Sequence, residues 1–277
     1  MIPKLPLAEW VEAGVDWLGS NLSFVFDLIS AVIEGIVNGL SAVFHFPPSL
    51  VLIALIAALA YYLGRWPFAV LAAAGLLLID NLGFWSNTMD TLALVMTSAL
   101  ISIVIGIPVG VWCAQHDKVR KIFTPLLDFM QTMPAFVYLI PAVTFFGLGV
   151  VPGVIASVIF AVPPTIRLTN LGIRQVAEDL VEAADAFGST PGQKLFKLQF
   201  PLAMPSIMAG VNQTIMLALS MVVIASMIGA QGIGADVYRA VTQIKTGQGF
   251  EAGLAIVVLA ILLDRITQYI MKKKRSV

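Results

Sequence analysis

A polar stretch at residues 182–201 contains the residues of this chain whose types and spacing could do chemistry. It opens with Glu182-Ala183-Ala184, continues through Phe187 and Gly188, and ends at Pro201. Nothing in it resembles a catalytic arrangement. Its chemistry would be that of docking, because small apolar faces beside charged groups need a surface on which to be buried.

Capping residues predict two short helices in this stretch. Gly188 lies where a C-terminal glycine can adopt the left-handed conformation that ends a helix. Thr190, Pro191 and Gln193 then read as an N-cap, a first-turn proline and a capping-box partner. Pro201 is expected to stop the second helix.

Each of these helices has an apolar face too small to fold alone. The first face consists of Val176, Leu180, Ala183, Ala184 and Phe187, and the second of Leu195, Phe196 and Leu198. Helical periodicity leaves two interpretations open. The faces dock on another protein, or they pack on helices of the same chain.

The composition places the stretch in a membrane protein. The chain has 277 residues, of which 59% are hydrophobic and 12% charged, whereas soluble proteins carry about 25% charged residues. The zero net charge argues against a nucleic-acid partner. A lone cysteine, Cys113, and two distant histidines, His45 and His116, argue against a disulfide and a metal site. No cleaved signal peptide is expected at the N-terminus.

Seven apolar segments predict an all-α polytopic membrane protein. They are residues 49–63, 68–82, 89–114, 126–148, 150–162, 205–228 and 253–269. The first two form an accessory hairpin (49–84) around a tight turn, and Pro163-Pro164 is expected to end the fifth. The core covers 85–271, includes the polar loop 167–201, and is followed by a basic tail, 272–277.

Residues 1–48 differ from the rest because acids interrupt their apolar residues. Leu22, Ile29, Ile36 and others follow helical spacing, which predicts an amphipathic helix along the membrane interface or on another subunit. The alternative is a weak first transmembrane helix.

Basic residues predict the orientation. Twelve of the sixteen Lys and Arg fall on one side if the spans alternate. Because positive loops stay in the cytoplasm, the polar loop and the C-terminus of this multi-pass membrane protein are expected there. The four tail cations, Lys272–Arg275, would also attract anionic membrane lipid.

The polar loop resembles the EAA loop of ABC-importer permeases. That pattern is Glu-Ala-Ala, three residues, Gly, nine residues, Ile, one residue, Leu and Pro. This chain departs from it with Leu198 for Ile and Phe200 for Leu. The resemblance implies a helix that docks on an ATPase subunit. The coupling residues it implies are Glu182, Ala183, Ala184, Phe187, Gly188, Leu198 and Pro201.

A second resemblance covers most of the chain and is to glycine betaine/proline betaine permeases. The segments that carry it are Gln131–Tyr138, Ala186–Thr190, Asn212–Ile224, Ala240–Gly247 and Gly249–Gly253. It implies the MetI-like type I ABC importer permease fold and import of a quaternary-ammonium osmoprotectant. Choline and carnitine systems share much of the pattern.

The sequence contains no Gly-x-x-x-x-Gly-Lys-Ser/Thr phosphate loop, so this chain is not expected to be an enzyme. The resemblance implies that ATP and Mg are held by a partner ATPase. It also implies a separate extracytoplasmic substrate-binding protein and a permease homodimer. The rival functions are an ion-driven secondary transporter, which would need intramembrane acids, and a structural or sensory membrane protein such as a channel.

A betaine would meet two kinds of group along its path: aromatic faces for the methylated cation and hydrogen-bond donors for the carboxylate. The candidates are Asn212, Gln213, Thr214, Ser220, Phe136 and Tyr138. The alternative for each is packing between helices. Asp264 and Arg265 either pair with another helix or reach the membrane interface. The second alternative is favoured. The glycine-rich segment 229–234 follows a span and predicts a turn rather than a nucleotide loop.

Overall fold

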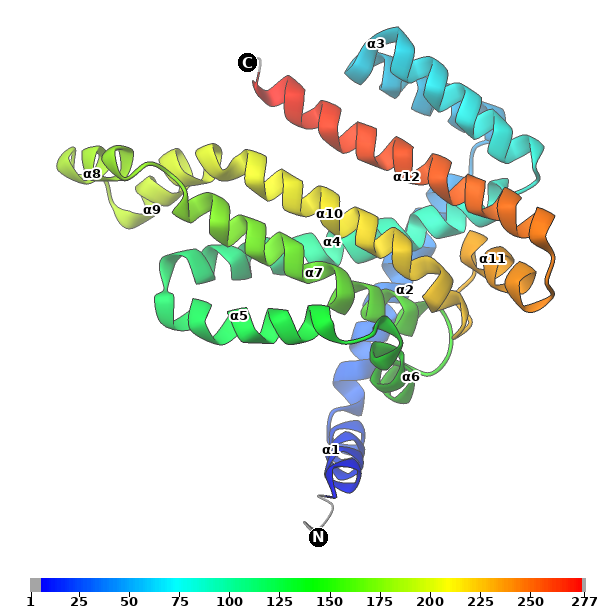
Figure 1. Cartoon of the computed structure of the whole chain (residues 1–277), viewed down its shortest axis with the longest axis horizontal. Helices are drawn as coiled ribbons and strands as arrows, with labels where there is room; N and C mark the ends of the chain where they lie inside the picture. The colour runs from blue at the N-terminus through cyan, green and yellow to red at the C-terminus, as the bar shows by residue number, and fades with distance from the viewer. Residues whose placement is uncertain (1–5, 276–277) are drawn as a thin grey trace.

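The computed structural model describes residues 6–275, with the backbone alone for 272–275, and this part of the chain is helical throughout its regular structure (Figure 1). The elements are α1 (Leu7–Asn21), α2 (Ser23–His45), α3 (Ser49–Asn81), α4 (Trp85–Gln115), α5 (Asp117–Thr132), η1 (Ala135–Tyr138), α6 (Leu139–Phe146), α7 (Val150–Arg174), α8 (Glu178–Ala186), α9 (Pro191–Gln193), η2 (Lys194–Gln199), α10 (Phe200–Ser226), α11 (Ile233–Thr242) and α12 (Thr246–Arg275).

Helices α4, α7 and α10 form the centre of the bundle and pack through small residues. A Cβ on Gly110 of α4 would lie 2.6 Å from Cβ of Thr169 on α7. A Cβ on Gly210 of α10 would lie 3.1 Å from the carbonyl oxygen of Pro164 on α7. In lipid, helices associate through such close contact, because the hydrophobic effect contributes little between them.

Within the described residues, six helices are long and apolar enough to cross a membrane, or seven if α5 and α6 are one bent span. The hairpin predicted for residues 49–84 is present as α3, which reverses direction at Arg65 (φ 61°, ψ −158°). Ile53 and Ala60 before the turn share a buried cluster with Phe68 and Leu76 after it.

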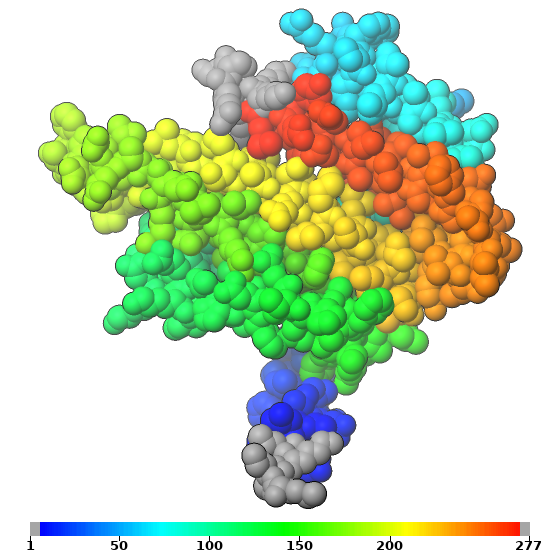
Figure 2. Space-filling view, viewed as in Figure 1, coloured from blue at the N-terminus to red at the C-terminus, as the bar shows by residue number. Residues whose placement is uncertain are grey.

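The described part of the N-terminal region forms two helices, α1 and α2, rather than one. All of α1 is outside the core, and α2 runs crosswise to α7 and α10 in Figure 1. We call α1 and α2 the N-terminal arm, and Figure 2 shows it projecting from the body of the molecule. By length and composition α2 qualifies as a span, so both interpretations of this region stay open.

Two predictions about prolines were wrong. Pro163 and Pro164 do not end a span, because α7 continues through them to Arg174. Both rings are buried, and packing in the bundle outweighs the two lost backbone donors. Pro201 does not stop a helix either: the helical backbone passes without a break from η2 into α10, and Pro201 lies directly after the π-helical turn.

The span predicted at 126–148 is broken, with an angle of 106° between its halves. Pro134 is the cause. In a continuous helix the carbonyl oxygen of Met130 would accept from the N–H of residue 134, and proline has none. The buried Tyr138 replaces it, because its hydroxyl donates to that carbonyl. We call this contact the Tyr138 clasp.

Replacing Tyr138 with Phe should therefore destabilise the protein, because the Met130 carbonyl loses its donor in a partly buried place. We expect a loss of about 1–3 kcal/mol in the free energy of unfolding, measured by thermal unfolding in detergent. Tyr238→Phe makes the same change at a partly exposed position of α11 and should alter it by less than about 0.5 kcal/mol. Equal values for the two variants would contradict the clasp.

Candidate functional site

The polar loop folds as its capping residues predict. Helix α8 ends before Gly188, which has φ 75°. The hydroxyl of Thr190 accepts from the backbone N–H of Gln193 (3.3 Å), and the Gln193 side chain accepts from the N–H of Thr190 (3.0 Å). The second helix then winds as a π-helix through η2 before it continues into α10.

The apolar side chains of the loop divide between two surroundings. Leu195 is 6% exposed and packs with Ile173 and Ile207, at the ends of α7 and α10. Phe187 is 91% exposed and Phe196 is 68% exposed, and α8 has no buried residue. Leu195 therefore anchors the loop on its own chain. Most of the apolar surface remains open to a partner.

The other residues predicted for coupling lie on the same projection, which forms the left end of the molecule in Figure 1. Glu182, Ala183 and Pro201 are exposed, and Ala184 and Leu198 are half-buried. The structure brings the set together around the turn at Gly188, although Leu198 and Pro201 belong to the segment that joins α10. Their role in coupling stays a prediction.

Ion pairs that the sequence reasoning missed hold this end of the bundle. Lys194 contacts both carboxylate oxygens of Asp185 at 2.8 Å and so joins η2 to α8. Arg174, at the end of α7, contacts Asp117 at 2.8 Å. Exposed pairs contribute about 0–1 kcal/mol each, so they set the orientation of the segments more than their stability.

Two of the candidates for a solute path point into the protein. Asn212 donates to Asp264 on α12 (2.8 Å) and accepts from Thr267 (2.6 Å). Thr214 donates to the carbonyl oxygen of Ala161 (2.7 Å). These hydrogen bonds join α10 to α12 and to α7. They correspond to the alternative in which the side chains serve packing between helices rather than a solute path.

The favoured interpretation of Asp264 was wrong. Its carboxylate does not simply reach the interface, since it accepts from Asn212 and from Gln268 (2.7 Å) within the bundle. Hydropathy could not show this, because the partner lies 52 residues away in the sequence. Arg265, the next residue on α12, is exposed.

Three other path candidates lie on the surface. Gln213 and Ser220 are exposed, and Ser220 donates to the carbonyl oxygen of Met216 on its own helix (3.0 Å). Phe136 is exposed at the break between α5 and α6. The sixth candidate, Tyr138, faces inward, where its hydroxyl donates to the carbonyl oxygen of Met130 in the Tyr138 clasp. The candidates therefore do not form one site within a single chain.

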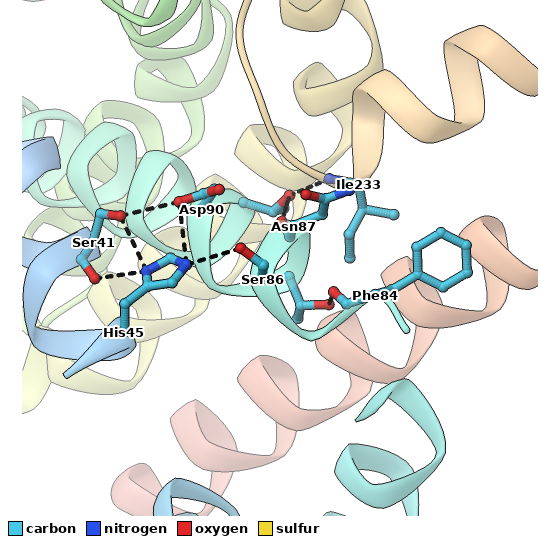
Figure 3. A network of polar contacts seen from close by, with 9 residues as sticks. Ser41, His45, Phe84, Ser86, Asn87, Asp90 and Ile233 are labelled. Carbon is cyan, nitrogen blue, oxygen red and sulfur yellow. Dashed lines mark hydrogen bonds and ion pairs between the residues drawn. The ribbon is translucent and has the colours of Figure 1, made fainter. Parts of the chain in front are cut away.

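A polar network at the other end of the bundle was not found from the sequence (Figure 3). Ser41 of α2 donates to Asp90 of α4 (3.0 Å), and His45 contacts Ser86 (3.2 Å). Farther along, the hydroxyl of Thr91 accepts from the N–H of Ile233 (2.9 Å). Helix α4 thus holds both the N-terminal arm and the start of α11.

The segment 229–234 is the turn that leads into α11. Gly229 and Gly232 have φ values of 95° and 119°, which L-residues rarely adopt. A Cβ on Gly232 would lie 2.4 Å from the hydroxyl of Thr91. The prediction of a glycine turn rather than a nucleotide loop is confirmed, because a helix and not a strand precedes it.

Neighbouring residues Asn212 and Gln213 should respond differently to the same change. Asn212→Leu leaves the Asp264 carboxylate without a donor from α10, so we expect a loss of about 1–3 kcal/mol in the free energy of unfolding in detergent. Gln213→Leu removes an exposed amide and should change it by less than about 0.5 kcal/mol. The assignment of inward and outward faces would be refuted if Gln213→Leu were the more damaging.

Comparisons with known proteins agree with this geometry. Residues 106–276 match the family described as binding-protein-dependent transport system inner membrane component. The chain is 57% identical to the glycine betaine transport system permease protein OpuAB of Bacillus subtilis, over 99% of this chain and 98% of that protein.

Two further relatives are similar over nearly the whole chain. The glycine betaine/carnitine transport permease protein GbuB of Listeria monocytogenes is 56% identical, over 99% of both chains. The glycine betaine/proline betaine transport system permease protein ProW of Escherichia coli is 49% identical, over 98% of this chain and 77% of that protein.

A solved structure shares the fold. The inward-facing MetNI methionine ABC transporter superposes with a TM-score of 0.64 at 20% identity, over 69% of this chain and 95% of the matched chain. The fold is therefore that of MetI-type ABC importer permeases, as predicted. Together the helices, the loop at Gly188 and the sequence matches show that the chain belongs to the family of binding-protein-dependent transport system inner membrane components.

Proposed function

We propose that this chain is the transmembrane permease subunit of an ATP-driven importer of glycine betaine or a related quaternary-ammonium solute. Support comes from relatives at 57% and 56% identity over nearly the whole chain that carry glycine betaine in their names. Permeases named for choline or carnitine alone are 25% identical over about two thirds of it. Carnitine remains a candidate additional solute, since one near relative is named for both.

The observation that carries the proposal is the exposed apolar tip of the polar loop. Phe187 is 91% exposed in a segment that is also charged, with Glu178, Glu182 and Asp185 on the same short helix. Lipid cannot cover such a segment, because charged groups are expensive to bury in hydrocarbon. A protein partner can cover it.

We infer that this partner is a separate ATPase, which would hold ATP and Mg. Closure of two ATPase subunits on ATP would move α8 and α9, and Leu195 would pass that motion to α7 and α10. Hydrolysis would reset the inward-facing state. In this account the loop end faces the cytoplasm, together with the basic C-terminus, in a bacterial or archaeal plasma membrane.

The opposite end, with α11, would then face an extracytoplasmic substrate-binding protein, as the family description implies. We further propose a homodimer of permeases. Gln213 and Ser220 are two helical turns apart on one exposed face of α10. Polar groups on a spanning helix turn toward a cavity or another helix, so this face would border a path shared by two copies.

The function is tested by uptake of labelled glycine betaine into proteoliposomes that contain the permease, its ATPase and its binding protein. We expect accumulation that requires ATP inside and the binding protein outside. An excess of unlabelled proline betaine, carnitine or choline, each added separately, ranks the solutes. Accumulation driven by an ion gradient without the ATPase would favour a secondary transporter, and solute-independent conductance would favour a channel.

The same assay distinguishes the coupling loop from a merely structural one. Gly188→Val forces a β-branched residue into φ 75°, which costs about 1–3 kcal/mol and distorts the turn. We expect uptake to fall at least tenfold while the permease remains in the membrane. Gly35→Val, on α2 and outside the loop, where a Cβ meets nothing within 4 Å, should retain uptake. Normal ATP-driven uptake by Gly188→Val would contradict the coupling role.

A further inference from the structure

The tip of the hairpin α3 carries a groove that the transport function does not explain. It is lined by Tyr61, Tyr62, Arg65 and Trp66 and has a volume of about 780 Å³. We call it the hairpin-tip groove. It lies outside the segment 106–276 that matches the family. Helix α3, which carries it, forms the upper edge of the molecule in Figures 1 and 2.

Arg65 occupies this tip in a strained backbone conformation. Its φ of 61° and ψ of −158° fall in a region that is essentially reserved for glycine. A Cβ on the preceding Gly64 would lie 2.7 Å from the ring of Tyr269 on α12, so a larger residue there would have to displace that ring. The turn thus lies directly against α12, and the residue with the strained backbone angles is Arg65.

The aromatic side chains beside Arg65 face outward. Trp66 is 70% exposed and Tyr61 is 57% exposed. Their rings meet at 87° with centroids 5.9 Å apart, so they form two walls of the groove. None of the four lining residues is acidic. The groove therefore offers one guanidinium and no competing carboxylate among its walls.

The surroundings of the groove are those of a membrane surface. Below the tip, both halves of α3 expose aliphatic side chains, including Leu55, Leu59 and Val70. Tyr269, whose ring stacks on Phe68 of the hairpin (5.1 Å), brings the end of α12 to the tip. That helix continues through four consecutive basic residues, Lys272–Arg275.

We propose that the hairpin-tip groove binds the phosphate of an anionic phospholipid headgroup. Arg65 would hold the phosphate oxygens, because guanidinium matches their geometry in a bidentate contact. Tyr and Trp rings belong at the headgroup level of a bilayer. The acyl chains would lie along the exposed aliphatic flank of α3, and the basic end of α12 would raise the local concentration of anionic lipid.

A free quaternary-ammonium solute is the other ligand that aromatic faces could attract. The aliphatic flank that continues from the groove favours the lipid, since a small solute would leave it uncovered. The solute is therefore an outcome of the test rather than a second proposal.

The test measures lipid binding to the detergent-purified complex of the permease with its ATPase, by native mass spectrometry during titration with phosphatidylglycerol. Arg65→Gly should weaken the tightest binding at least fivefold. Its thermal unfolding midpoint should equal or exceed that of the unchanged protein, because glycine accommodates φ 61° without strain. Trp66→Leu should also weaken the binding of phosphatidylglycerol.

Lys245→Gln removes an exposed cation at the opposite end of the bundle and should leave the affinity within twofold. Phosphatidylcholine, which bears no net charge, should bind at least fivefold more weakly than phosphatidylglycerol. Unchanged phosphatidylglycerol binding by Arg65→Gly would overturn the proposal. Equal binding of the two lipids would overturn it too, and so would displacement of phosphatidylglycerol by millimolar glycine betaine.

Discussion

The close contact between α7 and α10 is the interaction on which the rest of the structure depends. The two helices meet where Gly210 lies against the backbone of Pro164, and the hydroxyls of Thr165 and Thr214 are 2.7 Å apart. Pro163 and Pro164 remove two backbone donors from α7, and this packing keeps the helix continuous. Because the polar loop joins these two helices, a force on its tip would reach the middle of the bundle through this pair, as the proposed coupling requires.

The polar side chains of the spans fall into two groups with different consequences. Asn212 and Thr214 are used inside one chain, where they fix α10 against α12 and α7. Gln213 and Ser220 remain on the surface, where a lone chain in lipid would leave them poorly solvated. This division explains why the six predicted path residues do not meet in one site. It fits a transporter in which two copies border the path and a binding protein selects the solute.

Local features of the molecule could be predicted from the sequence, and features that depend on distant contacts could not. The turn at Gly188 and the cap at Thr190 follow from residues within one turn of each other. The effects of Pro134, Pro163 and Pro201 depend on their tertiary surroundings. The segment predicted as one span across Pro134 is broken, whereas the helices expected to end at Pro163 and at Pro201 continue. The bonds of Asp264 and of Asp90 join segments far apart in the chain, and no periodicity signals them.

The central claim, that energy enters through the exposed tip of the polar loop, is tested most directly by hydrogen–deuterium exchange. Backbone exchange would be followed in the permease alone and in complex with its ATPase, both in nanodiscs. The account predicts that the ATPase slows exchange at residues 178–200 more than at any other segment, with little change in α11. Unchanged exchange at 178–200, with protection elsewhere, would contradict it.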